Sequence, residues 1–191
     1  MAELDVSRFY TRLGKLHAAF LKQRSGAAWG GANCLALNRG QLNDENPYLK
    51  SVVMHHYLFG YELPDTALLL MESGKCYVLA TKKKCEFLEA AVGKAPEGSS
   101  VNELVLLTRN KSDGNAENIA TMMKEIEAAK NGENGSKKKV GVLVKEWSAG
   151  INTGPILSGW QKTLDDSDDV ELVDVAPGIG LALAVKDDTE L

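Results

Sequence analysis

Histidine is the residue type in this chain that most often supplies acid–base catalysis or metal ligation, and the chain has three of them. His55 and His56 are adjacent, so on a helix their side chains would point roughly 100° apart, whereas two imidazoles that share one metal ion need i, i+4 spacing. His17 is far from both in the sequence. The pattern therefore predicts packed or surface histidines and no metal site.

The cysteines do not have the pattern of a redox or zinc site. There are three, Cys34, Cys76 and Cys85, and no two of them have CxxC spacing. An odd number of cysteines does not suit a disulfide framework. We therefore expect reduced thiols, which are typical of cytosolic and nuclear proteins.

Sequence motifs of common enzyme classes are missing. The chain has no GxSxG around a serine, no HExxH and no GxxxxGK[ST] phosphate-binding loop. Gly178-Ile179-Gly180 looks like the start of the dinucleotide-binding GxGxxG, but Leu183 stands where the third glycine is required. The sequence predicts a protein without a catalytic centre and without a cofactor.

Acidic residues are densest near the C-terminal end of the chain. An acidic cluster speeds and orients the approach of a basic partner, and it also occurs as a solvated turn that keeps a domain soluble. The sequence leaves both interpretations open. The cluster comprises Asp165, Asp166, Asp168, Asp169 and Glu171, with Asp174 close by.

Three consecutive lysines, Lys82, Lys83 and Lys84, fall in the first turn of a predicted helix. Cations at this end oppose the helix dipole by about 0.3–1 kcal/mol each when exposed. A local rule that is broken in this way can mark function, so the three lysines are a second candidate for partner binding. If the helix begins later, they lie in a loop and carry no such cost.

The composition is that of an ordinary globular domain. Hydrophobic residues make up 44% and charged residues 25% of the 191 positions. The net charge of -4 and the pI of about 5.5 disfavour nucleic acid as the main ligand, since nucleic-acid domains usually have a basic face. The first residues combine acids and arginines without an apolar stretch, so no signal peptide is expected, and no apolar run approaches the ~20 residues of a membrane helix.

Apolar periodicity predicts alternating helices and strands, an order that favours an α/β fold with a mixed, largely parallel sheet flanked by helices on both faces. Residues 1–185 are expected to form a single domain, and residues 186–191 to begin a linker. Loops or turns are expected over 39–46, 131–139 and 165–169. Helices are expected over 5–24, 47–59, 81–92, 115–130, 155–164 and 177–185, and strands over 34–38, 66–71, 76–80, 103–108, 140–144 and 170–175.

Five segments along the chain carry a resemblance to a known family. They are GGANCLAL (30–37), DENPYLKS (44–51), FGYELPDT (59–66), TKKKCEFLEA (81–90) and AVKDDTEL (184–191). In their order and spacing they resemble the N-terminal region of the large subunit of the FACT histone chaperone, from roughly residue 5 to the end. The resemblance implies a fold similar to the first, smaller lobe of aminopeptidase P, prolidase and creatinase, followed by a second lobe that is missing here. In the active peptidases that second lobe holds the metal ligands, so none is implied in this chain.

The resemblance also implies a function. It is that of a non-catalytic protein-binding module of a histone chaperone that reorganises nucleosomes in transcription and replication, in the nucleus and on chromosomes. The implied partners are core histones or other chromatin proteins, with the smaller FACT subunit bound through other domains of the full protein. Sequence-specific nucleic acid and membranes are not expected as partners. One alternative is a lobe that caps the active site of an aminopeptidase P-like metallopeptidase, and another is a purely structural lobe that only supports its neighbour.

Two further expectations concern local structure. Gly60, Tyr61, Glu62 and Pro64 are interpreted as fold-determining, with Gly60 ending a helix and Pro64 preceding a strand whose hydrogen-bond ladder it cannot join. The segment PGIG at 177–180 departs from the family, and each glycine lowers helix propensity by about 1 kcal/mol. The last helix is therefore expected to start late or to fray.

Overall fold

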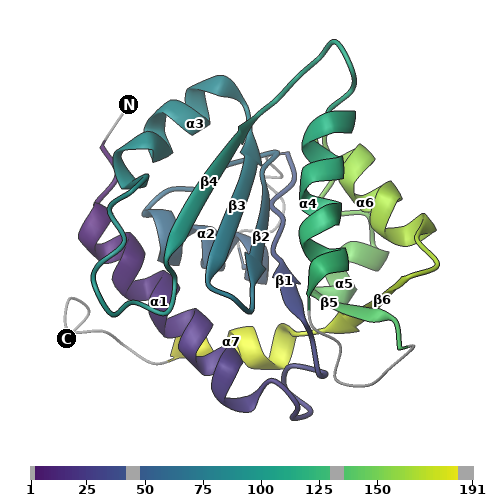
Figure 1. Cartoon of the computed structure of the whole chain (residues 1–191), viewed down its shortest axis with the longest axis horizontal. Coiled ribbons are helices and arrows are strands. Elements are labelled where there is room, and N and C mark those ends of the chain that lie inside the picture. The colour runs from purple at the N-terminus through teal and green to yellow at the C-terminus, as the bar shows by residue number, and fades with distance from the viewer. Residues whose placement is uncertain (1–2, 42–47, 130–135, 185–191) are drawn as a thin grey trace.

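The computed structural model describes residues 3–41, 48–129 and 136–184 of the chain. Within them, a six-stranded sheet forms the centre of the molecule in the order β4-β3-β2-β1-β5-β6 (Figure 1). The strands are β1 (Cys34–Ala36), β2 (Ala67–Met71), β3 (Lys75–Ala80), β4 (Glu103–Thr108), β5 (Lys138–Val142) and β6 (Val170–Asp174).

The sheet combines parallel and antiparallel pairs. β3 and β4, β1 and β5, and β5 and β6 are parallel, whereas β2 is antiparallel to both of its neighbours, β1 and β3. The hairpin between β2 and β3 turns at Gly74, which has a φ of 92° and no room for a Cβ beside the Ser100 carbonyl. The predicted α/β fold with a mixed, largely parallel sheet is confirmed.

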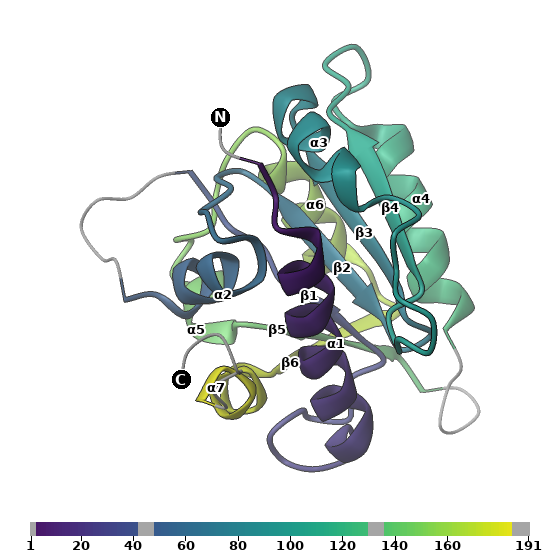
Figure 2. The ribbon, with the colours of Figure 1, turned by 90° about the vertical axis from the view of Figure 1, so that its left-hand side faces the viewer.

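Helices cover both faces of the sheet (Figure 2). A short α5 (Val144–Ser148) follows β5, and the 3-10 helix η1 (Glu89–Ala91) extends α3. None of the helices in the described residues has the length and apolarity that a membrane crossing requires. One face packs against α1 (Val6–Gln23), α2 (Lys50–Phe59), α3 (Lys82–Leu88) and α7 (Ala176–Ala184), and the other against α4 (Ala116–Ala128) and α6 (Leu157–Asp166).

Side chains that alternate along β1 point into two separate apolar cores, one on each face of the sheet. Leu35 belongs to the core under α1, whereas Cys34 and Ala36 belong to the core under α4 and α6, as the period of two in a strand requires. Trp29 fills the first core in edge contact with Phe20, at 5.5 Å between ring centroids. A sheet buried on both faces explains the uninterrupted apolar run of β2.

The first helix forms as its sequence predicts. Asp5 precedes it and accepts a hydrogen bond from the Arg8 backbone N–H at 3.0 Å, which satisfies one of the free donors at the helix start. The side chains at the expected spacing of four, three and four are all buried: Phe9, Leu13, Leu16 and Phe20.

The predicted starts of α2 and β5 are wrong by two to three residues. α2 begins at Lys50 rather than at residue 47, because Leu49 has an extended ψ of 139° that a helix cannot include; the predicted cap at 46–47 lies outside the described residues. β5 begins at Lys138 rather than at 140, since the Lys138 N–H donates to the Asp169 carbonyl at 2.9 Å. Residues 138–139 of the expected loop thus belong to β5, and residues 131–135 lie outside the described residues.

The C-terminal third also differs from expectation. The five-residue α5 was not predicted, because so short a helix has no apolar period to detect. α6 continues through Asp166 into the predicted turn. α7 does not start late, since the Asp174 side chain accepts a hydrogen bond from the Ala176 N–H at 3.1 Å and holds the first turn. The predicted linker at 186–191 lies outside the described residues.

Candidate interaction surfaces and the buried polar network

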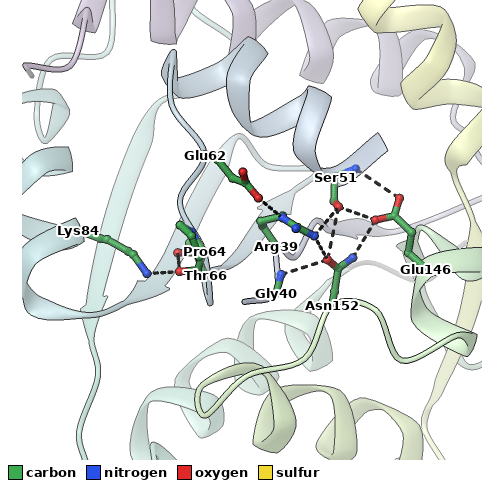
Figure 3. A network of polar contacts seen from close by, with 9 residues as sticks. All are labelled: Arg39, Gly40, Ser51, Glu62, Pro64, Thr66, Lys84, Glu146 and Asn152. Carbon is green, nitrogen blue, oxygen red and sulfur yellow. Dashed lines mark hydrogen bonds and ion pairs between the residues drawn. The ribbon is translucent and has the colours of Figure 1, made fainter. Parts of the chain in front are cut away.

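A buried polar network lies at the carboxyl ends of β1 and β5, and Arg39 is its centre (Figure 3). The Arg39 side chain is 0% exposed; its Nε donates to Glu62 Oε1 at 2.6 Å, and its Nη1 donates to Asn152 Oδ1 at 2.9 Å. The sequence placed Arg39 in a polar loop, and it does lie beyond the end of β1, but it is fully buried. Its backbone pairs with Thr66 beyond the end of β1, which carries the side chain under α2.

A second carboxylate closes the network from α5. The Ser51 hydroxyl donates to Glu146 Oε1 at 2.5 Å, and the Asn152 amide donates to the same oxygen at 3.1 Å. The Gly40 N–H donates to Asn152 Oδ1 at 3.1 Å, which ties the end of β1 to the loop before α6. Ser51 beside a carboxylate is a pair that could activate a nucleophile, but Ser51 is fully buried, so the network holds elements together and reaches no substrate.

The segment FGYELPDT (59–66) contributes Glu62 to this network and makes further contacts that hold the segment in place. Gly60 ends α2 with a φ of 75°, a left-handed conformation that glycine adopts without strain. Glu62 pairs with Arg39, and the Pro64 carbonyl accepts a hydrogen bond from Lys84 (Figure 3). Tyr61 packs edge-on against Phe87 of α3. These contacts agree with the fold-determining role expected for this segment.

Asp65 extends the same segment to the other face of the sheet. Its backbone has a φ of 51°, an uncommon conformation for a residue with a side chain. Its carboxylate accepts hydrogen bonds from the backbone N–H groups of Ile156 and Leu157 at the start of α6, at 3.1 and 3.3 Å. Gly154 leaves the space for it, because a Cβ there would overlap the carboxylate. Asp65 therefore caps α6 from a distant part of the chain.

The three candidate lysines do not act as one group. They occupy the first turn of α3, as predicted, and Lys82 and Lys83 are exposed. Lys84 is half-buried against Pro64, and burial lowers the pKa of its ammonium group while the Asp65 charge opposes that shift. Lys84 thus has a structural role, and only the other two remain available to a partner.

The candidate acidic residues lie together at the end of α6 and the start of β6, and all are exposed. The Asp165 carboxylate accepts a hydrogen bond from the Trp147 indole N–H at 2.8 Å, and Asp166 pairs with Lys162 at 2.9 Å. Asp174 does not join them, because its carboxylate holds the start of α7. We call the exposed group the acidic patch: Asp165, Asp166, Asp168, Asp169 and Glu171.

The histidines are spread over the fold. His55 is fully buried in edge contact with Phe59, and burial with the nearby charges of Arg39, His56 and Lys84 lowers its pKa to about 3. His17 lies beside the Met71 carbonyl at 3.0 Å, whereas His56 is exposed. Among the residues that the structure describes, no three histidine, cysteine, aspartate or glutamate side chains gather as a metal site would require.

The cysteines and the Gly-Ile-Gly segment belong to the core. Cys34, Cys76 and Cys85 are free and buried, and burial raises the pKa of the first two to about 12, which keeps them as unreactive thiols. Gly178 lies in α7 where a Cβ would overlap the Trp29 ring. This glycine allows the close packing of α7 on Trp29.

Sequence reasoning missed the network residues. Arg39, Ser51, Glu146 and Asn152 are polar residues in unremarkable contexts, far apart along the chain. The only local signal is the apolar strand that ends just before Arg39, since polar groups at the carboxyl ends of parallel strands tend to converge.

Comparison with known families shows where the chain belongs. Residues 4–178 match the model of the FACT complex subunit SPT16 N-terminal lobe domain. The FACT complex subunit ctc-2 of Neurospora crassa is 35% identical over 195 residues, and the FACT complex subunit spt16 of Aspergillus fumigatus is 31% identical over 191 residues. These matches cover 99% and 98% of this chain but 17% of each relative, so the chain spans about a sixth of their length.

Solved structures give the same result. The N-terminal domain of FACT complex subunit SPT16 from Cicer arietinum matches with a TM-score of 0.80 and 27% identity, over 98% of this chain and 40% of that one. The corresponding domain from Eremothecium gossypii shares the fold, with a TM-score of 0.77. The chain belongs to the family of FACT complex subunit SPT16 N-terminal lobe domains.

Proposed function

We propose that this domain is a non-catalytic protein-binding module of the histone chaperone FACT. The observation that carries the proposal is the family match over residues 4–178. The buried polar network around Arg39 supports the proposal. Its Ser51 hydroxyl lies beside the Glu146 carboxylate but is fully buried, so this pair cannot reach a substrate. The full protein would reorganise nucleosomes in the nucleus during transcription and replication, with its smaller subunit bound through other domains.

The acidic patch is the surface that we propose for core histones or other chromatin proteins. Its five carboxylates are exposed at one end of α6, and histones are strongly basic. Charge complementarity of this kind raises the association rate and orients the partner. Asp166, Asp168 and Asp169 are the best residues to change, since Asp165 also holds the Trp147 side chain.

The extent of the domain is part of the same proposal. The matched region makes up 40% of the solved N-terminal domain from Cicer arietinum. This share supports the inference that residues 1–185 form the first lobe of a larger domain, and that residues 186–191 lead towards the second.

Calorimetric titration of the 191-residue chain with core histone complexes tests the binding, at ~0.15 M salt and again at ~0.5 M, where screening is stronger. We expect saturable binding that persists at the higher salt. D166K/D168K/D169K should weaken it at least about tenfold, since like charges then face the histone. The matched control is E86K/E97K/E127K, which changes the net charge equally at exposed positions elsewhere and should stay within about twofold of the wild type. No binding at ~0.15 M salt, or equal losses in both variants, would refute the proposed surface.

A further inference from the structure

A group of cations lies at the end of the sheet where β3 and β4 finish side by side. The two strands are parallel, with Ala80 paired to Thr108, and the Arg109 N–H donates to the Ala80 carbonyl at 2.8 Å. The chain after β3 turns into α3, beside the end of β4, in both ribbon views (Figures 1 and 2). We call the four basic residues that follow the two strand ends the strand-end cations: Lys82, Lys83, Arg109 and Lys111.

These charges are not neutralised by neighbouring acids. Lys82, Lys83 and Lys111 are exposed and Arg109 is half-buried. In the described part of the chain, none of the four forms an ion pair. Asp113 is the acid in the turn after Lys111, and its two carboxylate oxygens accept hydrogen bonds from the N–H groups of Asn115 and Glu117. Glu86, one turn further along α3, is also exposed, and it forms no ion pair with these cations in the described residues.

The partner of this surface must be negatively charged. Basic histones would be repelled by it, so its three exposed lysines do not suit the histone partner proposed for the acidic patch. Protein interfaces usually contain aromatic or other apolar anchors at their centre. Of the large hydrophobic side chains that are exposed in the described residues, none belongs to 81–83 or 109–111. The backbone of duplex DNA needs no such anchor, because phosphate contacts depend on positive charge and carry no sequence information.

We propose that the strand-end cations bind the phosphate backbone of duplex DNA without sequence preference. This activity is additional to the proposed histone contact and uses the opposite charge on another part of the surface. It also agrees with the acidic net charge of the chain, since four local cations give weak, salt-sensitive binding and not a DNA-binding domain.

Fluorescence anisotropy of the 191-residue chain with two labelled 30-base-pair duplexes of unrelated sequence tests the proposal. At ~50 mM salt we expect both duplexes to bind with similar dissociation constants, no weaker than the about 10⁻⁴ M that marks weak non-specific binding at physiological salt. If all four cations contact phosphates, raising the salt to ~200 mM should weaken binding roughly a hundredfold. K82E/K83E should weaken binding at ~50 mM at least about tenfold and reduce the salt dependence by about two phosphate contacts.

The matched control is K15E/K124E, which makes the same change in net charge at exposed helical positions outside the strand-end cations and should bind within about twofold of the wild type. The K82E/K83E variant is expected to fold, because acidic residues suit the first turn of a helix; circular dichroism checks this. Equal losses in both variants would show a general charge effect and overturn the proposal. So would no binding at ~50 mM salt, or tighter binding of a polyglutamate peptide than of the duplex, which would assign the surface to an acidic protein.

Discussion

His55 makes the stability of the fold depend on pH. Its pKa is near 6.5 in the unfolded chain and is lowered to about 3 in the fold, mainly by burial. The unfolded chain therefore binds the proton more readily throughout the interval between these values, so the folded state is at full stability above pH 6.5 and loses it as the pH falls towards 3. The loss is about 1.4 kcal/mol per pH unit, or about 2 kcal/mol between pH 7 and pH 5.

Urea denaturation of the wild type and of His55→Phe at pH 7 and pH 5 measures this contribution. We expect the free energy of unfolding to drop less in the variant by about 2 kcal/mol, since phenylalanine does not titrate. Thr11→Ala is the control, because Thr11 is exposed and its side chain does not titrate. A pH dependence in His55→Phe as large as in the wild type would locate its source in another group.

Asp65 is the second residue whose substitution has a defined cost. Asp65→Ala removes the acceptor for two buried N–H groups at the start of α6, so we expect a loss of about 1–3 kcal/mol in the free energy of unfolding. Asp65→Asn should lose less, because asparagine keeps an acceptor oxygen and tolerates the φ of 51°. Urea denaturation at pH 7 compares the two. Equal losses would mean that the charge matters and the acceptor does not.

At the scale of elements, the lysines in the first turn of α3 lower the stability of that helix, because they oppose its dipole. The helix has seven residues, and no acid lies in its first turn. Lys82→Glu with Lys83→Glu should stabilise it by about 0.3–1 kcal/mol per substitution, since acidic side chains interact favourably with the helix N-terminus. Slower amide hydrogen exchange over residues 82–91 would report this gain. Faster exchange would show that the two lysines stabilise α3 through contacts of their stems.

Elements with a long apolar period or a dense apolar run could be predicted from the sequence. α1, α4 and the β2–β3 hairpin lie close to their expected places, because each buries a face whose spacing is visible in the chain. Boundaries set by partners distant in sequence could not be predicted. The early start of β5 depends on the Asp169 carbonyl, and the packing of α7 depends on the space beside Trp29.

At the scale of the whole molecule, Arg39 joins parts that are far apart in the chain. It connects the end of β1 to the segment after α2 through Glu62, and to the loop before α6 through Asn152. Arg39→Met should lower the free energy of unfolding by about 3–5 kcal/mol, because it leaves the largely buried carboxylate of Glu62 without its cation. A double-mutant cycle with Glu62→Gln, followed by urea denaturation, isolates the pair. A coupling energy near zero would mean that the pair with Glu62 adds nothing, and that Arg39 acts through Asn152 and packing.

The exposed candidates and the buried network differ in how far the sequence reveals them. The acidic patch and the lysines of α3 are contiguous runs, so their composition alone makes them visible. Arg39, Glu146 and Asn152 become neighbours only when β1 and β5 pair, and no local pattern records that pairing. Lys84 looks like its two neighbours in the sequence, and only the position of Pro64 separates it from them.

The position of β1 has a consequence for synthesis on the ribosome. β1 pairs with two strands, β2 and β5. β2 is the next strand to be translated, whereas β5 is translated only after β3, β4 and α4. At about 5–20 residues per second, β5 is completed about 2–7 s after the end of β4. During that time the nascent chain exposes one unpaired edge of β1, together with the polar groups of Arg39 that await Asn152. A pause in translation over residues 109–137 would prolong this exposure and favour aggregation of the nascent chain.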